Sequence, residues 1–191
     1  MKLLLIQLLS TILSVNAEFK SDPTAHIKLE KITLNIPPEN PYLGDIVTHE
    51  IFDPGDIISV KFSVKKDFPE NMKLNVVLLL EEVEITNFEM FLCEAMEEKL
   101  NVKPALESGL PVGKFPTGCP VKAGNDYELR KYQIPYVGVP GFPSGKFFVR
   151  IVFYEPDKDP CATINIEGSF FHELPGVPKI PGAPDILGIG R

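Results

Sequence analysis

Several short segments of the chain alternate apolar and polar residues with a period of two. The pattern covers residues 57–64, 72–80, 146–154 and 162–170, and a fifth segment at 26–36 shows it before two prolines end it. A period of two places successive side chains on opposite faces of an extended strand, so that one face can be buried. Turn-forming Pro and Gly separate the segments. We therefore predict an all-β, antiparallel domain with two sheets packed as a sandwich or cup.

Residues 88–101 have a different pattern. The segment is rich in helix-forming residues, and a stripe of apolar residues recurs at helical spacing: Met90, Cys93, Met96 and Leu100. This spacing predicts one short amphipathic helix with Cys93 on its buried side. Pro104 is expected to end the helix. The alternative for this segment is a further strand edge or an irregular loop.

Residues 1–17 have the pattern of a secretory signal peptide. Lys2 precedes an apolar run, and Val15 and Ala17 are small residues before a cleavage site at Glu18. The run is too short for a comfortable transmembrane span of about 20 apolar residues. We therefore predict a secreted domain over residues 18–173 without a stable membrane anchor. A flexible tail rich in Pro and Gly is expected over residues 174–191.

The charge of the chain argues against one class of partner. The chain has 26 acidic and 19 basic residues, and its net charge is −7. Non-specific nucleic-acid binding depends on basic residues that neutralise phosphates. The chain also lacks the polybasic cluster that favours an anionic membrane surface. We therefore expect no nucleic-acid partner.

No motif in the chain indicates catalytic chemistry. The histidines lack the spacing of zinc ligands: His26, His49 and His172. The acidic residues at 81, 82 and 84 fit a solvated strand end better than a catalytic carboxylate pair. A papain-like thiol needs a nearby histidine and a lowered pKa, and Cys119 precedes Pro120 instead of opening a helix. We therefore predict no enzyme, no metal ion and no cofactor.

The odd number of cysteines leaves a pairing question. Cysteines of secreted proteins tend to form disulfides, and Cys93, Cys119 and Cys161 allow three different single bonds. Each choice leaves one cysteine that is either free and buried or joined to another chain.

An ordered set of motifs from residue 118 onward resembles one known family, the ML-type (MD-2-related) lipid-recognition family. Its nearest branch looks like the ganglioside-activator proteins. The motifs are, in order, Cys119-Pro120, the turn at 122–124, Tyr127, the proline-flanked apolar stretch 135–143, Ser144-Gly145, the apolar strand 147–154 and Cys161. The resemblance covers residues 27–171 and is strongest after 118. It implies a two-sheet β-sandwich opened into a lipid-binding cup, with an apolar cavity and no catalytic machinery.

The resemblance gives the apolar strand faces a use. It implies a lipid-cavity wall built from Val60, Phe62, Leu74, Val76, Leu78, Phe147, Val149, Ile151, Phe153, Ile164 and Ile166. It also implies a cavity rim with three aromatic candidates: Phe88, Phe91 and Phe142. A packed core uses the same residue types, so a filled interior is the alternative for every wall residue.

The resemblance also implies a disulfide between Cys93 and Cys119. In the family, the cysteine of the last strand pairs with an N-terminal cysteine, which this chain lacks, so Cys161 is expected to be unpaired. The implied function is a secreted lipid-binding or transfer protein that buries an acyl or sterol group. The expected ligands are fatty acyl lipids, phospholipids, glycolipids or sterols.

Such a carrier could present its lipid to a lipid hydrolase or a receptor, and lysosomal delivery is left open. The alternative is a secreted protein-binding module with a filled core that serves an innate-immune or chemosensory partner. A hydrolase is the least favoured function, because a histidine and a nucleophile would have to converge in the folded chain.

Overall fold

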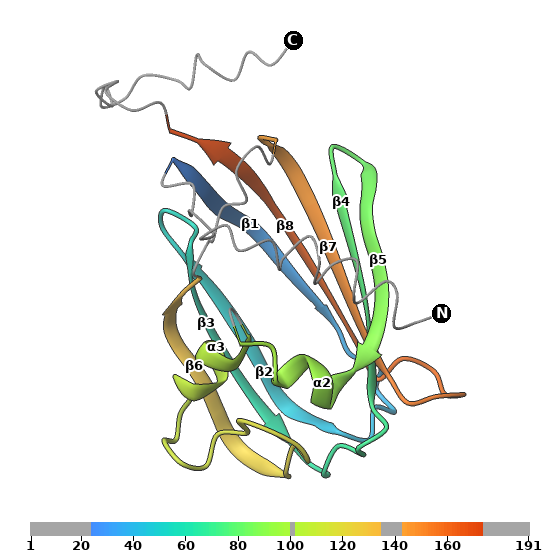
Figure 1. The fold of residues 1–191 in the computed structure, drawn as a ribbon. Helices are drawn as coiled ribbons and strands as arrows, with labels where there is room; N and C mark the ends of the chain where they lie inside the picture. Colours follow the sequence, from blue (N-terminus) through green and yellow to red (C-terminus); the bar gives the residue numbers. More distant parts are fainter. Residues whose placement is uncertain (1–23, 100–101, 135–142, 174–191) are drawn as a thin grey trace.

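The computed structural model describes residues 24–99, 102–134 and 143–173. In this part of the chain, two antiparallel sheets form a sandwich with two short helices at one end (Figure 1). The two-sheet, all-β fold class predicted from the alternation is confirmed. The predictions of a signal peptide at 1–17, a tail at 174–191 and a rim residue at Phe142 lie outside the described residues.

The larger sheet has the strand order β1-β8-β7-β4-β5. Its strands are β1 (Ala25–Asn35), β8 (Ala162–His172), β7 (Gly145–Tyr154), β4 (Lys73–Leu80) and β5 (Val83–Phe91). The smaller sheet has the order β2-β3-β6, with β2 (Leu43–Phe52), β3 (Ile57–Val64) and β6 (Gly124–Gln133). The five segments with period-two alternation correspond to β1, β3, β4, β7 and β8.

The prediction of one helix over residues 88–101 is wrong in its bounds. Residues 88–91 belong to β5, and two short helices follow, α2 (Leu92–Met96) and α3 (Val102–Glu107). Pairing with a central strand outweighs the helix preference of residues 88–91, since strand formation depends on cross-strand contacts. Pro104 lies in the first turn of α3, where its missing N–H removes no helical hydrogen bond.

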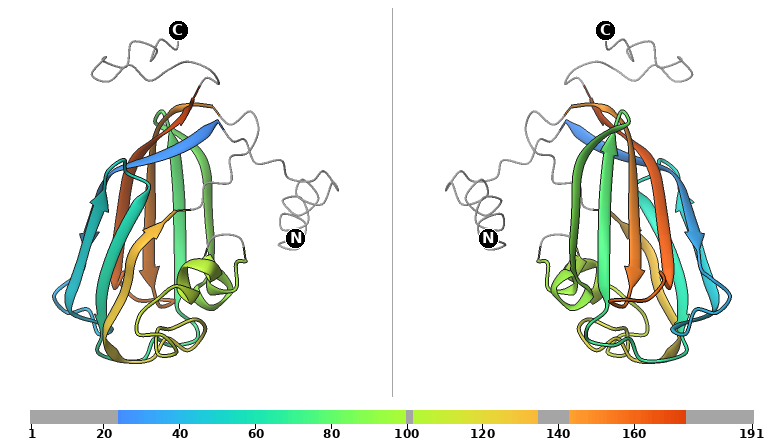
Figure 2. Two further views of the ribbon diagram at one scale, coloured as in Figure 1. Left: turned by 90° about the vertical axis from the view of Figure 1, so that its left-hand side faces the viewer. Right: turned by 90° about the vertical axis from the view of Figure 1, so that its right-hand side faces the viewer.

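The two sheets meet along one side and have their free edges on the other. Strands β1 and β2 come into contact, whereas β5 and β6, the other edge strand of each sheet, lie on the side away from this contact (Figures 1 and 2). Helix α2 contacts β5, helix α3 contacts β6, and the helices contact each other. The helices therefore bridge β5 and β6 at one end of the molecule.

A disulfide holds this helical end. Cys93 in α2 is bonded to Cys119 in the loop before β6, across a sequence separation of 26 and a Cα–Cα distance of 5.5 Å. Closing a loop of this length stabilises a fold by about 3 kcal/mol, mainly by restricting the unfolded chain. Cys161 is a buried free thiol.

Buried apolar residues gather at the two ends of the sandwich. The helix-end cluster consists of Val64, Met96, Phe115, Val121 and Tyr127. The hairpin-end cluster, near the β4–β5 turn, consists of Leu29, Leu80 and Phe147. A third cluster, next to the helix-end cluster, consists of Tyr42, Met72 and Cys161. Two residues, Phe68 and Leu92, pack against both the helix-end and the third cluster.

Candidate functional site

One row of apolar side chains crosses the larger sheet between the buried clusters. The strand register aligns Leu34 with Ile164, Ile164 with Ile151, Ile151 with Val76, and Val76 with Phe88. Directly paired residues of antiparallel strands point to the same face of a sheet. We call these residues the middle row: Leu34, Ile164, Ile151, Val76 and Phe88.

The middle row faces the smaller sheet. Two residues further along each strand, Leu78, Val149 and Ile166 pack against the hairpin-end cluster. Ile51 and Ile58 of the smaller sheet pack against that same cluster, so this face of the larger sheet is the inner one. Because residues two apart on a strand share a face, the middle row also points into the sandwich.

The middle row is only partly buried. Phe88 is 40% exposed, and the other four members are half-buried. Within the described part of the chain, none of the five packs against a buried cluster. Val60, on β3 of the opposite sheet, is likewise half-buried and outside the clusters. Since filled protein interiors are close-packed, half-buried apolar side chains outside every cluster distinguish this row from the two ends of the described sandwich.

The predicted wall residues fall into two groups. One group contributes to the ends of the sandwich: Phe147 is buried in the hairpin-end cluster, and Phe62, Leu78, Val149, Phe153 and Ile166 are half-buried against one of the clusters. Leu74 is buried and pairs with Phe153, although it belongs to no cluster. The other group lines the centre and touches no cluster: Val60, Val76, Ile151 and Ile164. Leu34 joins this second group, although it was not among the predicted wall residues.

The two predicted rim residues that the structure describes lie on opposite faces of β5. Phe88 pairs with Val76 and therefore faces the interior. Phe91 pairs with Lys73 and faces outward, with the Lys73 Nζ 5.5 Å from the centre of the Phe91 ring. Only Phe88 thus lies where it can contact the middle of the sandwich.

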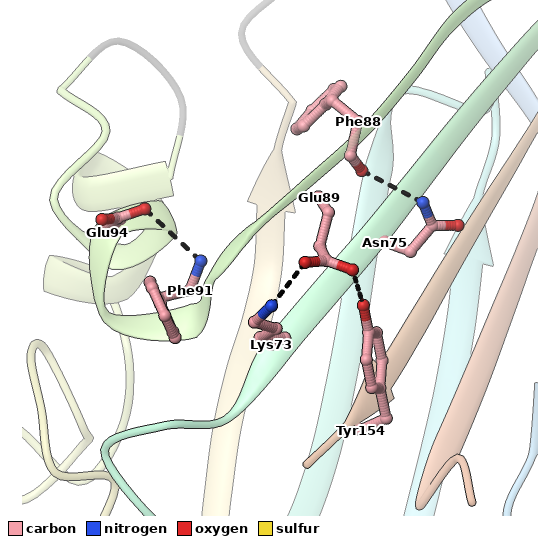
Figure 3. Close-up of polar contacts among 7 residues, drawn as sticks. All are labelled: Lys73, Asn75, Phe88, Glu89, Phe91, Glu94 and Tyr154. Carbon is pink, nitrogen blue, oxygen red and sulfur yellow. Dashed lines mark hydrogen bonds and ion pairs between the residues drawn. The ribbon is translucent and has the colours of Figure 1, made fainter. Parts of the chain in front are cut away.

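A polar network on the outer face fixes β5 to its neighbours (Figure 3). The Glu89 carboxylate accepts hydrogen bonds from the Lys73 ammonium, at 2.6 Å, and from the Tyr154 hydroxyl. The bond to Glu89 raises the pKa of Tyr154 to about 12. The Asn75 side-chain amide donates to the Phe88 carbonyl at 3.2 Å. These contacts join β4, β5 and β7 on the face of the sheet opposite the Phe88 side chain.

A bulge in β6 changes which residues face the interior. Tyr132 pairs with Ile58 and Leu129 pairs with Val60, so two residues of β6 oppose Ser59 alone. One of them, Lys131, has a φ of 47°, and its N–H donates to the Ser59 Oγ at 2.9 Å. A bulge of this kind re-aims the side chains that follow it.

The bulge turns Lys131 outward and Tyr132 inward. The Lys131 Nζ lies 5.3 Å from the centre of the Phe52 ring, and Phe52 pairs with Ile57, the neighbour of inward-facing Ile58. A strict period of two from Tyr127 would place Lys131 inside the sandwich. Sequence reasoning therefore missed Tyr132, and the alternating pattern contains no signal that would have found it.

The cysteines and His26 have structural contacts. Cys93 and Cys119 are bonded to each other, and burial raises the pKa of the Cys161 thiol, whereas a nucleophilic cysteine needs a lowered pKa. The His26 ring lies 3.7 Å from a Glu173 carboxylate oxygen. In the described ranges, His, Cys, Asp and Glu form no group that could hold a metal ion.

Residues 24–99, 102–134 and 143–173 contain no helix with the length and hydrophobicity of a membrane span.

No family model and no curated protein matches the chain in sequence. Several solved structures are similar to it, among them the following two. The crystal structure of chicken MD-1 complexed with lipid IVa has a TM-score of 0.38 and 13% identity, and the match covers 78% of this chain and 98% of that one. The Niemann-Pick type C2 protein from Japanese carpenter ant has a TM-score of 0.33 and 14% identity, over 74% of this chain and 89% of that one.

Proposed function

We propose that the chain is a secreted, non-enzymatic lipid-binding protein that holds an acyl or sterol group between its two sheets. The observation that carries this proposal is the middle row, whose apolar side chains face the opposite sheet and pack against no buried cluster among the described residues. A bound apolar chain would supply packing partners that the described residues do not.

The dimensions and energetics of the middle row suit an acyl chain. Its five residues lie on adjacent strands, and strand spacings of about 4.8 Å make the row roughly 19 Å long. Removing each CH₂ group of a ligand from water contributes about 0.8 kcal/mol. Several methylene groups along the row would therefore give useful affinity without an ion pair.

The free edges of the two sheets are the proposed entry. Strands β5 and β6 are the edges of the two sheets away from the β1–β2 contact, and the helices bridge them at one end (Figure 1). Phe88 lies on β5, faces inward and is 40% exposed, so its ring can contact a lipid that passes this edge. Phe88 is thus the proposed rim residue.

The proposed location is extracellular. The signal-peptide pattern at 1–17 supports it, as does the disulfide, because such bonds persist in oxidising compartments. We further propose that the protein presents its bound lipid to a hydrolase or a receptor. We also propose that the chain belongs to the ganglioside-activator-like branch, on the basis of the motifs after residue 118.

A pair of adjacent substitutions tests the proposal. Ile151→Trp fills the centre of the sandwich, whereas Val152→Trp adds the same side chain to the opposite face of β7. With delipidated protein and the fluorescent fatty acid cis-parinaric acid, we expect saturable uptake by the wild type and by Val152→Trp. We expect at least a tenfold weaker affinity for Ile151→Trp.

Two results would contradict the proposal. One is the absence of uptake by the wild type for fatty acid, phospholipid and sterol probes alike, which would favour a filled protein-binding module. The other is an equal effect of the two tryptophan substitutions, which would place the bound probe outside the sandwich.

A further inference from the structure

We propose that the Tyr132 hydroxyl recognises the polar end of the bound lipid by donating a hydrogen bond to its carbonyl or carboxylate oxygen. This inference rests on the proposed function and narrows the ligand class to acyl lipids. It follows from the position of Tyr132, from its missing partner and from the neutral character of the group.

Tyr132 lies on an edge strand, and its side chain is on the inner face of that strand. Its partner in the register, Ile58, packs against the hairpin-end cluster inside the sandwich. Strand β6 is an edge strand of the smaller sheet, on the side of the molecule opposite the β1–β2 contact. The Tyr132 side chain therefore lies on the inner face of a free-edge strand, and the inference assigns the polar head of a ligand held along the middle row to this edge.

The Tyr132 hydroxyl has no hydrogen-bond partner among the described residues, although its side chain is half-buried. The other tyrosines of the described ranges each have one. The hydroxyl of Tyr127 donates to the Lys122 carbonyl at 3.3 Å, Tyr42 bonds to Glu155, and Tyr154 bonds to Glu89. Among the described residues, Tyr132 thus has a hydroxyl donor that no protein group uses.

The bulge in β6 places a neutral hydroxyl donor on the inner face in place of a charged ammonium. Without it, the alternation would bring Lys131 to the inner face, and burying an ammonium without a partner is costly. The bulge places Tyr132 there instead, and burial raises the pKa of its phenol, which keeps the proton on the oxygen. A neutral donor recognises an acceptor oxygen whether or not the ligand is charged. A free acid and its ester should therefore both gain from it.

Matched tyrosine variants and three fluorescent probes test the inference. Tyr132→Phe removes the unused hydroxyl. The control, Tyr127→Phe, removes a hydroxyl from the same strand that already bonds within the protein. The probes are cis-parinaric acid, its methyl ester and diphenylhexatriene, a hydrocarbon that has no oxygen. Dissociation constants are measured by titration of the full chain.

We expect Tyr132→Phe to weaken binding of the acid and the ester about 3- to 10-fold, as for the loss of one hydrogen bond. Binding of the hydrocarbon should not change, and Tyr127→Phe should leave all three probes unaffected. A loss for the acid alone would also support the inference and would identify a carboxylate as the acceptor.

Three results would overturn the inference. Unchanged acid and ester affinities for Tyr132→Phe, with normal uptake by the wild type, would remove the role of Tyr132 and leave the proposed function intact. An equal loss for the hydrocarbon would show that Tyr132 acts by packing. Failure of the wild type to bind any of the three probes would overturn the proposed function and the inference together.

Discussion

The helix end and the centre of the sandwich are built from similar apolar residues but are packed differently. At the helix end, the rings of Phe62, Phe115 and Tyr127 contact one another at centroid distances of 5.6–5.9 Å, and two helices and a disulfide cover the cluster. In the centre, Ile151 and its row neighbours are half-buried with no cluster to pack against. Paired strands align apolar side chains everywhere, but only a covering element turns such a face into a core.

The largest effect is expected at the helix end. Phe115→Ala removes a ring that is 6% exposed and lies edge-on to both Phe62 and Tyr127. Loss of a buried phenylalanine costs about 3–5 kcal/mol, through lost burial and the cavity left behind. The free energy of unfolding from urea titration would measure it. A loss below about 1 kcal/mol would mean that the helix end is packed no better than the centre.

Removal of the disulfide should have a slightly smaller effect. Replacing Cys93 and Cys119 together by serine releases a loop with a sequence separation of 26 and should lower the free energy of unfolding by about 3 kcal/mol. The wild type should show one thiol, Cys161, and only after denaturation because it is buried. Two or more reactive thiols in the unreduced wild type would contradict the pairing that covers the helix end.

Tyr42 of the third cluster, next to the helix-end cluster, should make the free energy of unfolding fall at alkaline pH. Burial, followed by the hydrogen bond to Glu155, raises the pKa of Tyr42 from 10.0 to about 12. A raised pKa in the folded state gives stability that is complete below pH 10 and is lost as the pH rises through 12. Tyr42→Phe should therefore flatten the fall in unfolding free energy over this window. Identical pH dependences for variant and wild type would argue against a role for Tyr42.

The smallest effect is expected in the centre. Ile151→Ala should cost at most about 1 kcal/mol, because the side chain is half-buried and packs against no buried cluster of the described residues. Urea titration beside Phe115→Ala gives the direct contrast. A cost of 2–5 kcal/mol, the usual range for a filled core, would remove the distinction between the two regions.

The strands with a buried face could be predicted, whereas the exposed edge strands β2 and β5 could not. Alternation located β3 and β7 because their apolar residues recur on one face. Strand β2 carries Thr48, His49 and Glu50 as consecutive exposed residues, so its sequence resembles a loop. Strand β5 combines exposed Glu residues with helix formers, and only its pairing with β4 shows that it is extended.

The apolar character of the candidate site was predictable from the sequence, but the set of residues that forms it was not. Apolar periodicity and the family resemblance together nominated Val76, Ile151 and Ile164, which the register now aligns in one row. The sequence does not show which apolar positions meet a covering element, because Val149 and Ile151 look alike on β7. The inward position of Tyr132 depends on a bulge that period-two reasoning cannot anticipate.

Intermolecular nuclear Overhauser effects would test the central claim most directly. Protein with labelled Ile, Leu and Val methyl groups would be delipidated and titrated with oleic acid. We predict contacts from the lipid chain to the methyl groups of Val76, Ile151 and Ile164 in the middle row, and none to Val64 or Val121 in the helix-end cluster. Bound lipid without contacts to the middle row, or no bound lipid at all, would contradict the claim that the sandwich has a lipid-accepting centre.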